Sequence, residues 1–454
     1  MKYGFVKMGR RSFFSRYLNQ TRIIVLSFLV VILVGAGLLM LPCSSVSGLD
    51  YLDALFTATS ATCVTGLSTI NLASRLTPFG HVVVLLLVQI GGMGFMTLAS
   101  ATFVMLGRRF SLRERLNMRD YLSETDMSGL NKLAVGVVKL TAAIEGIGAV
   151  LLTVAFSFQF SFGRALWYGI FHSVSAFCNA GLDIIPVKES FEPYINNPFV
   201  LVVLALLIIV GGLGFIVVGD VIRAKKPKKL RIDSKIVLAT SGALLLFGTL
   251  VYMIFEYNNP ATLGGLSFGD KLANAFFFSA STRTAGFASF DVGQLSPVSR
   301  SVTIMLMFIG ASPGSTGGGI KTTTLFVLLV WVAAHIRQRK KTVIGMRKFG
   351  NTVRSKAATI FVLAIVTLTL AQTLLMGFDG GSFTYEQLLF EAVSAYATVG
   401  LSMGITGALS VGSKIVIILV MFMGRVGAYT LLLAATKKDK TPDNIQYQEF
   451  NIMM

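Results

Sequence analysis

Long apolar stretches recur along the chain and are separated by short polar segments. Six are continuous and span residues 23–41, 82–106, 133–156, 199–218, 236–255 and 357–376. Two more, 301–336 and 415–435, are interrupted, the first by a glycine-rich run and the second by Arg425. About 20 helical residues are needed to cross a bilayer core of roughly 30 Å. The pattern therefore predicts eight membrane spans.

Basic residues gather between alternate pairs of these spans. Clusters lie before residue 23 and at 108–119, 223–235, 337–356 and 437–440, and together they hold 29 of the 40 Lys and Arg residues. Basic residues in short loops stay on the cytoplasmic side of a membrane. Because two spans separate each cluster from the next, all five fall on one face. We therefore expect a multi-pass plasma-membrane protein with both termini in the cytoplasm.

A fourfold internal repeat appears in the segments that lie inside the paired spans. The segments align without gaps as FTATSATCVTGLS (56–68), FHSVSAFCNAGLD (171–183), FFFSASTRTAGFA (276–288) and FEAVSAYATVGLS (390–402). We number them 1 to 13, so that every segment has Phe at position 1 and Gly at position 11. The predicted repeats are 23–107, 130–222, 235–336 and 355–436, between a basic N-terminal segment (1–22) and a C-terminal tail (437–454).

Each repeat is predicted to contain a helix too short to cross the membrane. About ten apolar residues precede each position-11 glycine, and they span roughly 15 Å at 1.5 Å per residue. Such a helix must re-enter rather than cross, and the irregular loop after it is tolerated only where it lines a cavity shielded by protein. We therefore predict an all-α membrane protein, with four pseudo-repeats of span, re-entrant helix, filter loop and span around a central pore.

These loops have the residue types of a cation filter. Helix C-terminal ends carry partial negative charge, a ring of carbonyl oxygens can replace the hydration shell of K⁺, and glycine tolerates the backbone conformation required. The competing interpretation is close helix packing, which we favour for the glycines within full spans, Gly91, Gly92, Gly94, Gly211, Gly212 and Gly214. The predicted filter residues are Val64, Thr65, Gly66, Asn179, Ala180, Gly181, Thr284, Ala285, Gly286, Thr398, Val399 and Gly400.

A run of glycines and small polar residues at 310–319 interrupts the predicted span 301–336. It is not a phosphate-binding loop, because Ile320 separates Gly319 from Lys321, so no nucleotide is expected to bind this chain. An uncharged flexible loop at mid-membrane would lie across the ion path, and we predict a gate, with a static helix break as the alternative. The predicted gate residues are Gly310, Pro313, Gly314, Gly317, Gly318, Gly319, Lys321 and Arg425.

Several polar residues within apolar segments have open roles. Arg425 must face protein or water, because a charge at mid-membrane costs at least about 2.5–3.5 kcal/mol. It either tethers the gate loop through backbone carbonyls or forms a positive barrier to cations. Glu391 either adds negative potential near the ion path or makes local hydrogen bonds. Cys63 and Cys178 share position 8, which indicates small side chains behind the filter.

Composition and charge exclude most other classes. Only 13% of residues are charged and mean hydropathy is +0.73, so the net charge of +19 reflects membrane topology and not a nucleic-acid partner. The basic face suits anionic membrane lipids and an acidic docking surface. No His pair, Asp pair or nucleophile motif indicates an enzyme, and the three scattered His residues make a metal site improbable. A sodium- or proton-coupled cation symporter, using Glu145 or Asp220, stays as the alternative function.

The filter segments TCVTGLS, CNAGLD, TRTAGF and ATVGLS and the loop GASPGSTGGGIKTTT resemble those of the Trk/Ktr/HKT superfamily of potassium transporters, most closely its Ktr-type (KtrB) membrane subunits. The resemblance covers residues 23 to about 438. It implies potassium uptake with K⁺ as the transported substrate, stimulation by Na⁺, and potassium selectivity from Gly66, because serine at that position accompanies sodium selectivity. It also implies that Arg425 faces the gate.

The same resemblance implies an assembly. Relatives form homodimers with one pore per subunit, docked on a KtrA-like ring of cytosolic nucleotide-binding regulatory subunits. One departure concerns the residues after Arg425, where Gly427 and Ala428 stand at a point at which Trk relatives carry an acidic residue.

Overall fold

The computed structural model describes residues 20–94, 130–186, 191–224, 226–339, 343–344 and 347–436. Secondary structure in these ranges is helical apart from a small antiparallel hairpin, β1 (Val343–Ile344) and β2 (Arg347–Lys348). The prediction of an all-α fold is confirmed. The basic clusters 108–119 and 437–440, the tail to 454, most of the N-terminal segment and the end of the first repeat lie outside the described residues.

Each repeat contains a long first helix, a half-helix that ends at the filter segment, and a second apolar helix. The first helices are α2 (Gln20–Leu39), α8 (Leu130–Phe156), α12 (Ile232–Phe255) and α16 (Asn351–Asp379). The half-helices are α3 (Tyr51–Cys63), α9 (Phe162–Cys178), α13 (Phe268–Ser281) and α17 (Tyr385–Ala397). The second helices are α5 (Pro78–Met93), α10 (Pro198–Leu213), α14 (Pro297–Phe308) and α18 (Val411–Val426).

Shorter elements continue or connect these helices. Beyond the second helices lie α11 (Phe215–Ala224), α15 (Thr322–Ile336) and α19 (Ala428–Ala435). The connections hold α4 (Leu72–Arg75) and the 3₁₀ turns η1 (Glu192–Tyr194), η2 (Pro227–Lys229), η3 (Val292–Gln294) and η4 (Thr406–Ala408).

The half-helices have 13, 17, 14 and 13 residues, which is longer than the predicted ten or so. They begin several residues before the position-1 Phe, where polar residues act as N-caps. The Ser267 side chain accepts from the Asp270 N–H, and Thr384 forms a reciprocal capping box with Gln387. Such caps satisfy backbone donors that the first helical turn leaves free.

Within the described residues, length and composition identify four helical segments able to cross a membrane: Thr21–Leu39, Val135–Phe156, Ile232–Phe255 and Asn351–Asp379. Two helix pairs raise the number to six if each counts as one span, α10 with α11 (bent by 99°) and α18 with α19 (bent by 90°). The helices α5, α14 and α15 are apolar but shorter. Eight spans therefore remain a prediction, although every predicted stretch coincides with described helix over part of its length.

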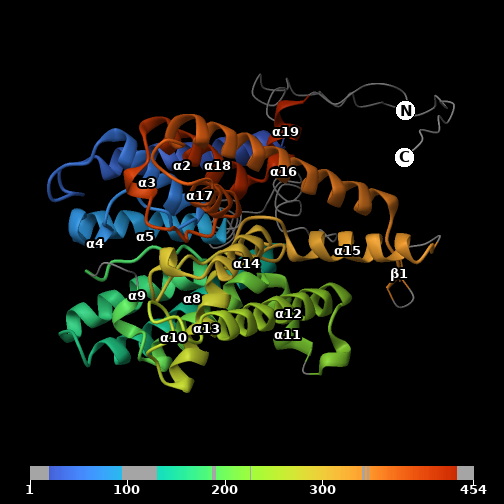
Figure 1. Cartoon of the computed structure of the whole chain (residues 1–454), viewed down its shortest axis with the longest axis horizontal. Coiled ribbons are helices and arrows are strands. Elements are labelled where there is room, and N and C mark those ends of the chain that lie inside the picture. Colours follow the sequence, from blue (N-terminus) through green and yellow to red (C-terminus); the bar gives the residue numbers. More distant parts are fainter. Residues whose placement is uncertain are drawn as a thin grey trace, which may run out of the picture.

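The four repeats pack in a closed cycle. The second helix of each repeat contacts the half-helix of the next, α5 with α9, α10 with α13, α14 with α17 and α18 with α3. In Figure 1, repeat 1 (blue) and α16 to α18 (orange to red) occupy one half of the molecule, and α8 to α13 (cyan to yellow-green) occupy the other. This cyclic packing brings the four filter segments to the centre of the molecule.

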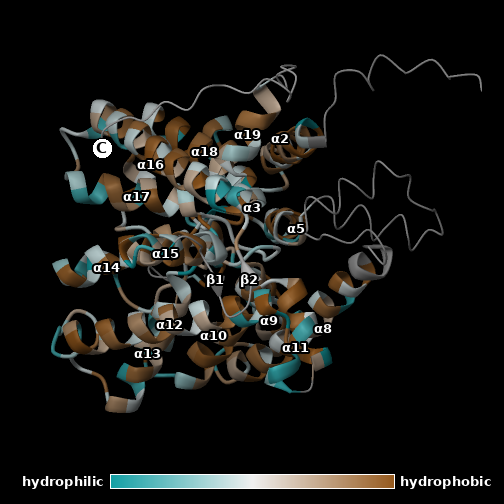
Figure 2. Ribbon diagram, turned by 90° about the vertical axis from the view of Figure 1, so that its right-hand side faces the viewer, coloured by the Kyte–Doolittle hydropathy of each residue, from teal (hydrophilic) through white to brown (hydrophobic). Residues whose placement is uncertain are grey.

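The outer surface of the helices is apolar. Figure 2 shows hydrophobic residues along most helices, and side chains such as Val34, Leu250 and Leu370 are more than half exposed. A contiguous surface of this kind is costly in water and is expected where lipid replaces water. The buried side chains form two clusters, one mainly from repeats 1 and 2 and the other mainly from repeats 3 and 4.

Candidate ion pathway

The four position-11 glycines meet in a ring. An ideal Cβ atom built on Gly66 would lie 3.2 Å from the Cα atoms of both Gly181 and Gly400. Cβ atoms built on Gly181 and Gly286 would each lie 3.0 Å from the Cα atom of the next glycine, Gly286 and Gly400. Glycines separated by more than 100 residues in the sequence are thus neighbours in space, as the internal repeat predicted.

Each of these glycines lies against a carbonyl oxygen from position 10 of a neighbouring repeat. The pairs are Gly66 with Ala180, Gly181 with Ala285, Gly286 with Val399, and Gly400 with Thr65. A Cβ atom at any of the four glycines would collide with the paired oxygen. The ring therefore gathers four carbonyl oxygens, which are the ligands that alkali cations bind in selectivity filters.

Positions 9 and 11 have left-handed backbone in all four loops. At position 9 the φ angles are 57° for Val64, 60° for Asn179, 75° for Thr284 and 51° for Thr398. Gln338 is the one other described residue besides glycine with a positive φ. A left-handed residue with a Cβ costs about 1–2 kcal/mol. In repeats 1, 2 and 4 this residue is the C-cap of the half-helix, so the left-handed conformation ends the helix at the same point in each of the three loops.

Recurring serines hold the loops in place. In repeats 1, 2 and 4 the position-10 N–H donates to the position-5 serine carbonyl, over 2.7–2.9 Å. The hydroxyls of Ser60 and Ser394 also accept from the glycine N–H groups of their loops, both over 3.1 Å. In repeat 3 the serine stands one residue later, and the Ser281 carbonyl accepts from the Ala285 N–H. Our sequence reasoning missed these serines, although the aligned segments contain them.

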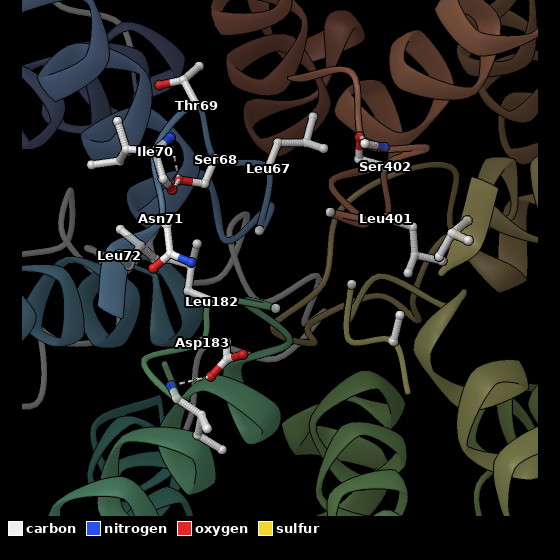
Figure 3. Close-up of a pocket in the computed structure, with 18 of the residues that line it drawn as sticks. Leu67, Ser68, Thr69, Ile70, Asn71, Leu72, Leu182, Asp183, Leu401 and Ser402 are labelled. Atoms are coloured by element: carbon white, nitrogen blue, oxygen red, sulfur yellow. Dashed lines mark hydrogen bonds between the residues drawn. The ribbon is translucent and has the colours of Figure 1, made fainter. Parts of the chain in front are cut away.

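A cavity of roughly 350 Å³ opens on one side of the glycine ring. The segments after the glycines line it, including Leu67, Leu182 and Leu401, and Figure 3 shows these segments around the open space. The Asp183 carboxylate at this cavity accepts from the Ile185 N–H over 2.7 Å and lies 2.9 Å from the His172 Nε2 atom. Polar backbone and an acidic side chain thus border the approach to the ring.

The loop 310–319 covers the opposite side of the ring. Its ends meet through a parallel bridge between Ile309 and Ile320, which closes it into a compact unit. Near the bridged ends, the Gly318 N–H donates to the Thr398 hydroxyl over 3.1 Å. A Cβ atom on Gly317 would collide with the Thr284 hydroxyl. Both threonines are at position 9, so the loop touches the filter segments directly.

The loop also binds the end of α10, where that helix breaks at Gly214 (φ 93°). The N–H groups of Ser312 and Thr316 donate to the carbonyls of Gly212 and Gly211, over 3.1 and 3.3 Å. The last carbonyls of any helix lack partners within the helix. The loop supplies those partners for α10, and this explains why polar backbone is stable at this depth.

Two cationic side chains hold the loop. The Arg425 guanidinium donates to the Thr316 carbonyl and to the carbonyls of Gly91 and Gly92, which end α5. The Lys321 ammonium donates to the Gly317 carbonyl over 2.7 Å. Helix C-terminal carbonyls carry partial negative charge and suit a cation. Backbone carbonyls are therefore the partners of Arg425 here, which matches the tether of the two open roles and needs no acidic residue at Gly427 or Ala428.

The glycines of the second helices divide into two types. Gly91, Gly211 and Gly424 lie against the position-7 carbonyls of their own repeats, so close that a Cβ atom would overlap the oxygen. Close packing is therefore confirmed for the first two. For Gly94 that interpretation is wrong, because its φ angle of 76° marks the point where α5 ends. Gly214, with a φ of 93°, ends α10 and also packs closely, since a Cβ atom there would lie 2.7 Å from the Pro313 carbonyl oxygen. A left-handed residue ends an α-helix, and glycine adopts it without a Cβ clash.

The remaining polar groups have local partners. Glu391 is buried and accepts from the hydroxyls of Ser402 and Thr406, which favours the local hydrogen-bonding role. Glu145 accepts from the Gln89 amide over 3.1 Å. Cys63 and Cys178 are buried free thiols, and a Cβ atom on Gly92 would touch the latter. In the part of the chain that the structure describes, no group of three His, Cys, Asp or Glu side chains could hold a metal ion.

Comparisons with known proteins agree with this arrangement. The TrkH family model, described as a cation transport protein, matches residues 7–447. The potassium/sodium uptake protein NtpJ of Enterococcus hirae is 38% identical over 96% of this chain and 97% of its own length. The Ktr system potassium uptake protein B of Vibrio alginolyticus is 40% identical over 96% and 95% of the two chains.

A solved structure shows the same fold. The crystal structure of the potassium transporter TrkH from Vibrio parahaemolyticus superposes with a TM-score of 0.72 and 18% identity, covering 92% of this chain and 85% of that one. The matched family consists of membrane transporters and not enzymes. The resemblance inferred from the filter and loop segments is confirmed, and the chain belongs to the TrkH family of cation transport proteins.

Proposed function

We propose that the chain is the ion-translocating, channel-like subunit of a Ktr-type potassium uptake system, with K⁺ as the transported substrate. The observation that carries this proposal is the closed ring of four glycines, each beside a position-10 carbonyl oxygen of a neighbouring repeat. Carbonyl oxygens in a ring substitute for the water that a potassium ion loses on entry. The names of the relatives from Vibrio alginolyticus and Enterococcus hirae, which specify potassium uptake, support the choice of ion.

In this proposal the twelve predicted filter residues at positions 9 to 11 select the ion and the loop 310–319 is the gate. Gly317 and Gly318 of the loop lie against position 9 of two filter segments, so an ion leaving the ring meets the loop directly. Lys321 and Arg425 place two positive charges on the same loop. Like charges repel an approaching cation, so the loop in this position opposes conduction by its bulk and by its charge.

The proposed assembly follows from the family and from the distribution of basic residues. The chain lies in the plasma membrane, with the glycine-ring cavity facing outward and both termini in the cytoplasm. It forms a homodimer and is controlled by a cytosolic ring of nucleotide-binding subunits, with Na⁺ stimulating uptake. Supporting this, the relatives from Vibrio alginolyticus and Bacillus subtilis are named as components of Ktr systems.

Passive conduction is proposed in preference to sodium- or proton-coupled symport. Of the two carboxylates considered for coupling, Glu145 accepts from Gln89, and Asp220 accepts from the Arg231 N–H over 2.9 Å in an exposed turn. Both thus have structural partners. Reversal potentials that depend on the potassium gradient alone would support conduction, and a dependence on Na⁺ or pH gradients would favour coupling.

Potassium flux through the purified full-length protein in liposomes tests the proposal. We expect Gly66→Ser to lower the preference for potassium over sodium, because a side chain at Gly66 collides with the Ala180 carbonyl of the ring. Gly37→Ser on α2 is the matched control, because a Cβ atom there meets no other atom within 4 Å. An unchanged preference in Gly66→Ser would overturn the assignment of the first filter, and absence of flux in the unmodified protein both with and without a cytosolic regulatory subunit would overturn the pore.

A further inference from the structure

We infer that the Thr398 hydroxyl is a latch that holds the gate loop against the filter, so that gate and filter are joined by one residue. The inference rests on the proposed function and goes beyond it, because it makes Thr398 a positioning residue for the gate. It depends on the side chains that the four position-9 residues present to the loop, and these differ among the repeats.

The four position-9 side chains are not equivalent. Val64 in repeat 1 has no hydrogen-bonding group. In repeats 2 and 3, the Asn179 side-chain amide and the Thr284 hydroxyl are 3.0 Å apart and form a hydrogen bond with each other. In repeat 4, the Thr398 hydroxyl accepts from the Gly318 N–H of the loop over 3.1 Å. Among the position-9 side chains, Thr398 is therefore the one that we assign as the latch.

The loop is built for this close approach. A Cβ atom on Gly318 would collide with the Thr398 hydroxyl, so glycine is required for its N–H to reach the hydroxyl oxygen. The neighbouring Gly319 has a φ of 68° and lies against Ala397, the last residue of α17. Two consecutive loop residues, Gly318 and Gly319, thus pack against the C-terminal end of α17.

Thr398 is also part of the filter backbone. Its φ of 51° is left-handed, and the next residue, Val399, contributes the carbonyl oxygen that lies beside Gly286. The side chain of Thr398 therefore binds the loop, while its backbone forms part of the filter. Withdrawal of the loop frees the Thr398 hydroxyl oxygen on the ion path, where it can turn toward a cation in place of the Gly318 N–H.

The latch is one of several attachments of the loop. Arg425 and Lys321 hold the loop through charge-assisted bonds, and two loop N–H groups donate to backbone carbonyls at the end of α10. A bond between neutral groups makes a modest net contribution, equivalent to a shift of roughly two- to tenfold in an equilibrium. Loss of the latch is therefore expected to shift the closed–open balance without removing the gate.

The experiment measures potassium flux in liposomes without any partner protein, together with the potassium-to-sodium ratio. We expect Thr398→Val to raise partner-free flux roughly two- to tenfold, because it keeps the branched shape and loses the hydroxyl. Thr398→Ser should restore flux to the unmodified level. Thr398→Ala is a second variant without a hydroxyl in case valine prevents folding, which size-exclusion chromatography would reveal.

A matched control lies on the outer side of α16. The Thr373 hydroxyl is exposed and donates to the Thr369 carbonyl of its own helix, so Thr373→Val should leave flux unchanged. Flux in Thr398→Val and Thr398→Ala equal to that of the unmodified protein would overturn the latch and leave the pore intact. A changed ion preference with unchanged flux would also overturn it, because the hydroxyl would then serve the ion and not the gate. Absent flux in every variant and in the unmodified protein, with a cytosolic regulatory subunit added as well as without it, would instead reject the pore.

Discussion

Repeats 3 and 4 have the same plan but have diverged in complementary ways. In repeat 3 the second helix, α14, ends at Phe308 and leads into the loop 310–319, which covers the ring. In repeat 4 the second helix continues to Val426 and carries Arg425, which binds that loop. One repeat supplies the proposed gate loop and the next supplies the arginine that binds it. The four filter loops stay alike because they must close one ring, whereas the second helices were free to specialise.

The two repeats also differ in how they support the filter from behind. In repeat 4, position 2 is Glu391, which binds Ser402 at position 13 and so ties the half-helix to the chain beyond the glycine. In repeat 3 the same positions are Phe277 and Ala288, both buried and apolar. Repeat 2 resembles repeat 4, with His172 beside Asp183. Hydrogen bonds can thus do in one repeat what apolar burial does in another.

The largest effect should come from a substitution in the glycine ring, to which all four repeats contribute. Gly286→Ala is expected to reduce potassium flux at least about tenfold, because a Cβ atom meets the Val399 carbonyl and a left-handed alanine is strained. Flux in liposomes measures it. Gly242→Ala, in α12 of the same repeat, has open space and should have near-normal flux. Normal flux in Gly286→Ala would mean that repeat 3 does not need to complete the ring.

The sequence was sufficient to predict the ring but not what holds the loop. The aligned Phe and Gly positions repeat four times, so the meeting of Gly66 with Gly181 and Gly400 followed from symmetry. The binding of Arg425 to backbone carbonyls could not be predicted in this way. The sequence predicted one continuous helix over 82–106, in which those carbonyls would accept hydrogen bonds from the N–H groups of the next turn. The end of α5 at Met93, with Gly94 as its C-cap, exposes its last carbonyls to Arg425, and a Gly-Gly-x-Gly pattern is equally typical of close packing and of a helix end.

Side-chain pairs distant in the sequence were also beyond prediction. Our reasoning left Glu391 between two roles because nothing in the half-helix indicates that Thr406 folds back to it. The N-cap of α14 is another example, since its partner Glu256 precedes it by 40 residues and belongs to another helix. Local patterns and repeats are visible in one sequence, whereas a contact between a loop and a helix end depends on the completed fold.

The second prediction tests the polar support that distinguishes repeat 4 from repeat 3. Glu391→Ala should lower stability by about 2–4 kcal/mol, because it leaves a cavity and removes the acceptor of two hydroxyls, those of the partly buried Ser402 and the buried Thr406. Thermal unfolding of the purified protein measures the change. The potassium-to-sodium ratio should fall as well, because the segment after Gly400 loses its tie to α17.

Glu391→Gln provides the control for this position. It keeps the size and one acceptor oxygen, so both unfolding temperature and ion preference should stay much closer to the unmodified values. An unfolding temperature of Glu391→Ala equal to that of the unmodified protein would show that the polar tie adds nothing, and that repeat 4 is held by apolar packing as repeat 3 is.

The smallest effect concerns a feature that the two repeats have in common, the tie between the end of the first helix and the start of the second. In repeat 3 the buried Glu256 carboxylate accepts from the Ser296 N–H over 3.0 Å and from its hydroxyl over 2.7 Å, and Ser296 is the N-cap of α14. In repeat 4, Asp379 accepts from the N–H of Ser410, the N-cap of α18, over 2.9 Å. One carboxylate thus joins two helices in each repeat.

The stabilisation that Glu256 contributes is expected to depend on pH. Burial raises the pKa of Glu256, but hydrogen bonds from Ser296, Ser299 and Thr262 outweigh it and hold the pKa below its usual value. A lowered pKa means that the carboxylate stabilises the fold above its ordinary pKa and loses that contribution as pH falls through the lowered value. Glu256→Gln should therefore cost about 1.5–3 kcal/mol at neutral pH, the range for hydrogen bonds to a charged group.

Unfolding temperatures of the unmodified protein and of Glu256→Gln, measured from pH 7 down to pH 3, test the sign. The difference in unfolding temperature between the two proteins should be largest at pH 7 and smaller at pH 3. Protonation of Glu256 removes its negative charge, and the uncharged glutamine then differs less from it. A constant difference would mean that the carboxyl group acts in this tie by its shape and not by its charge.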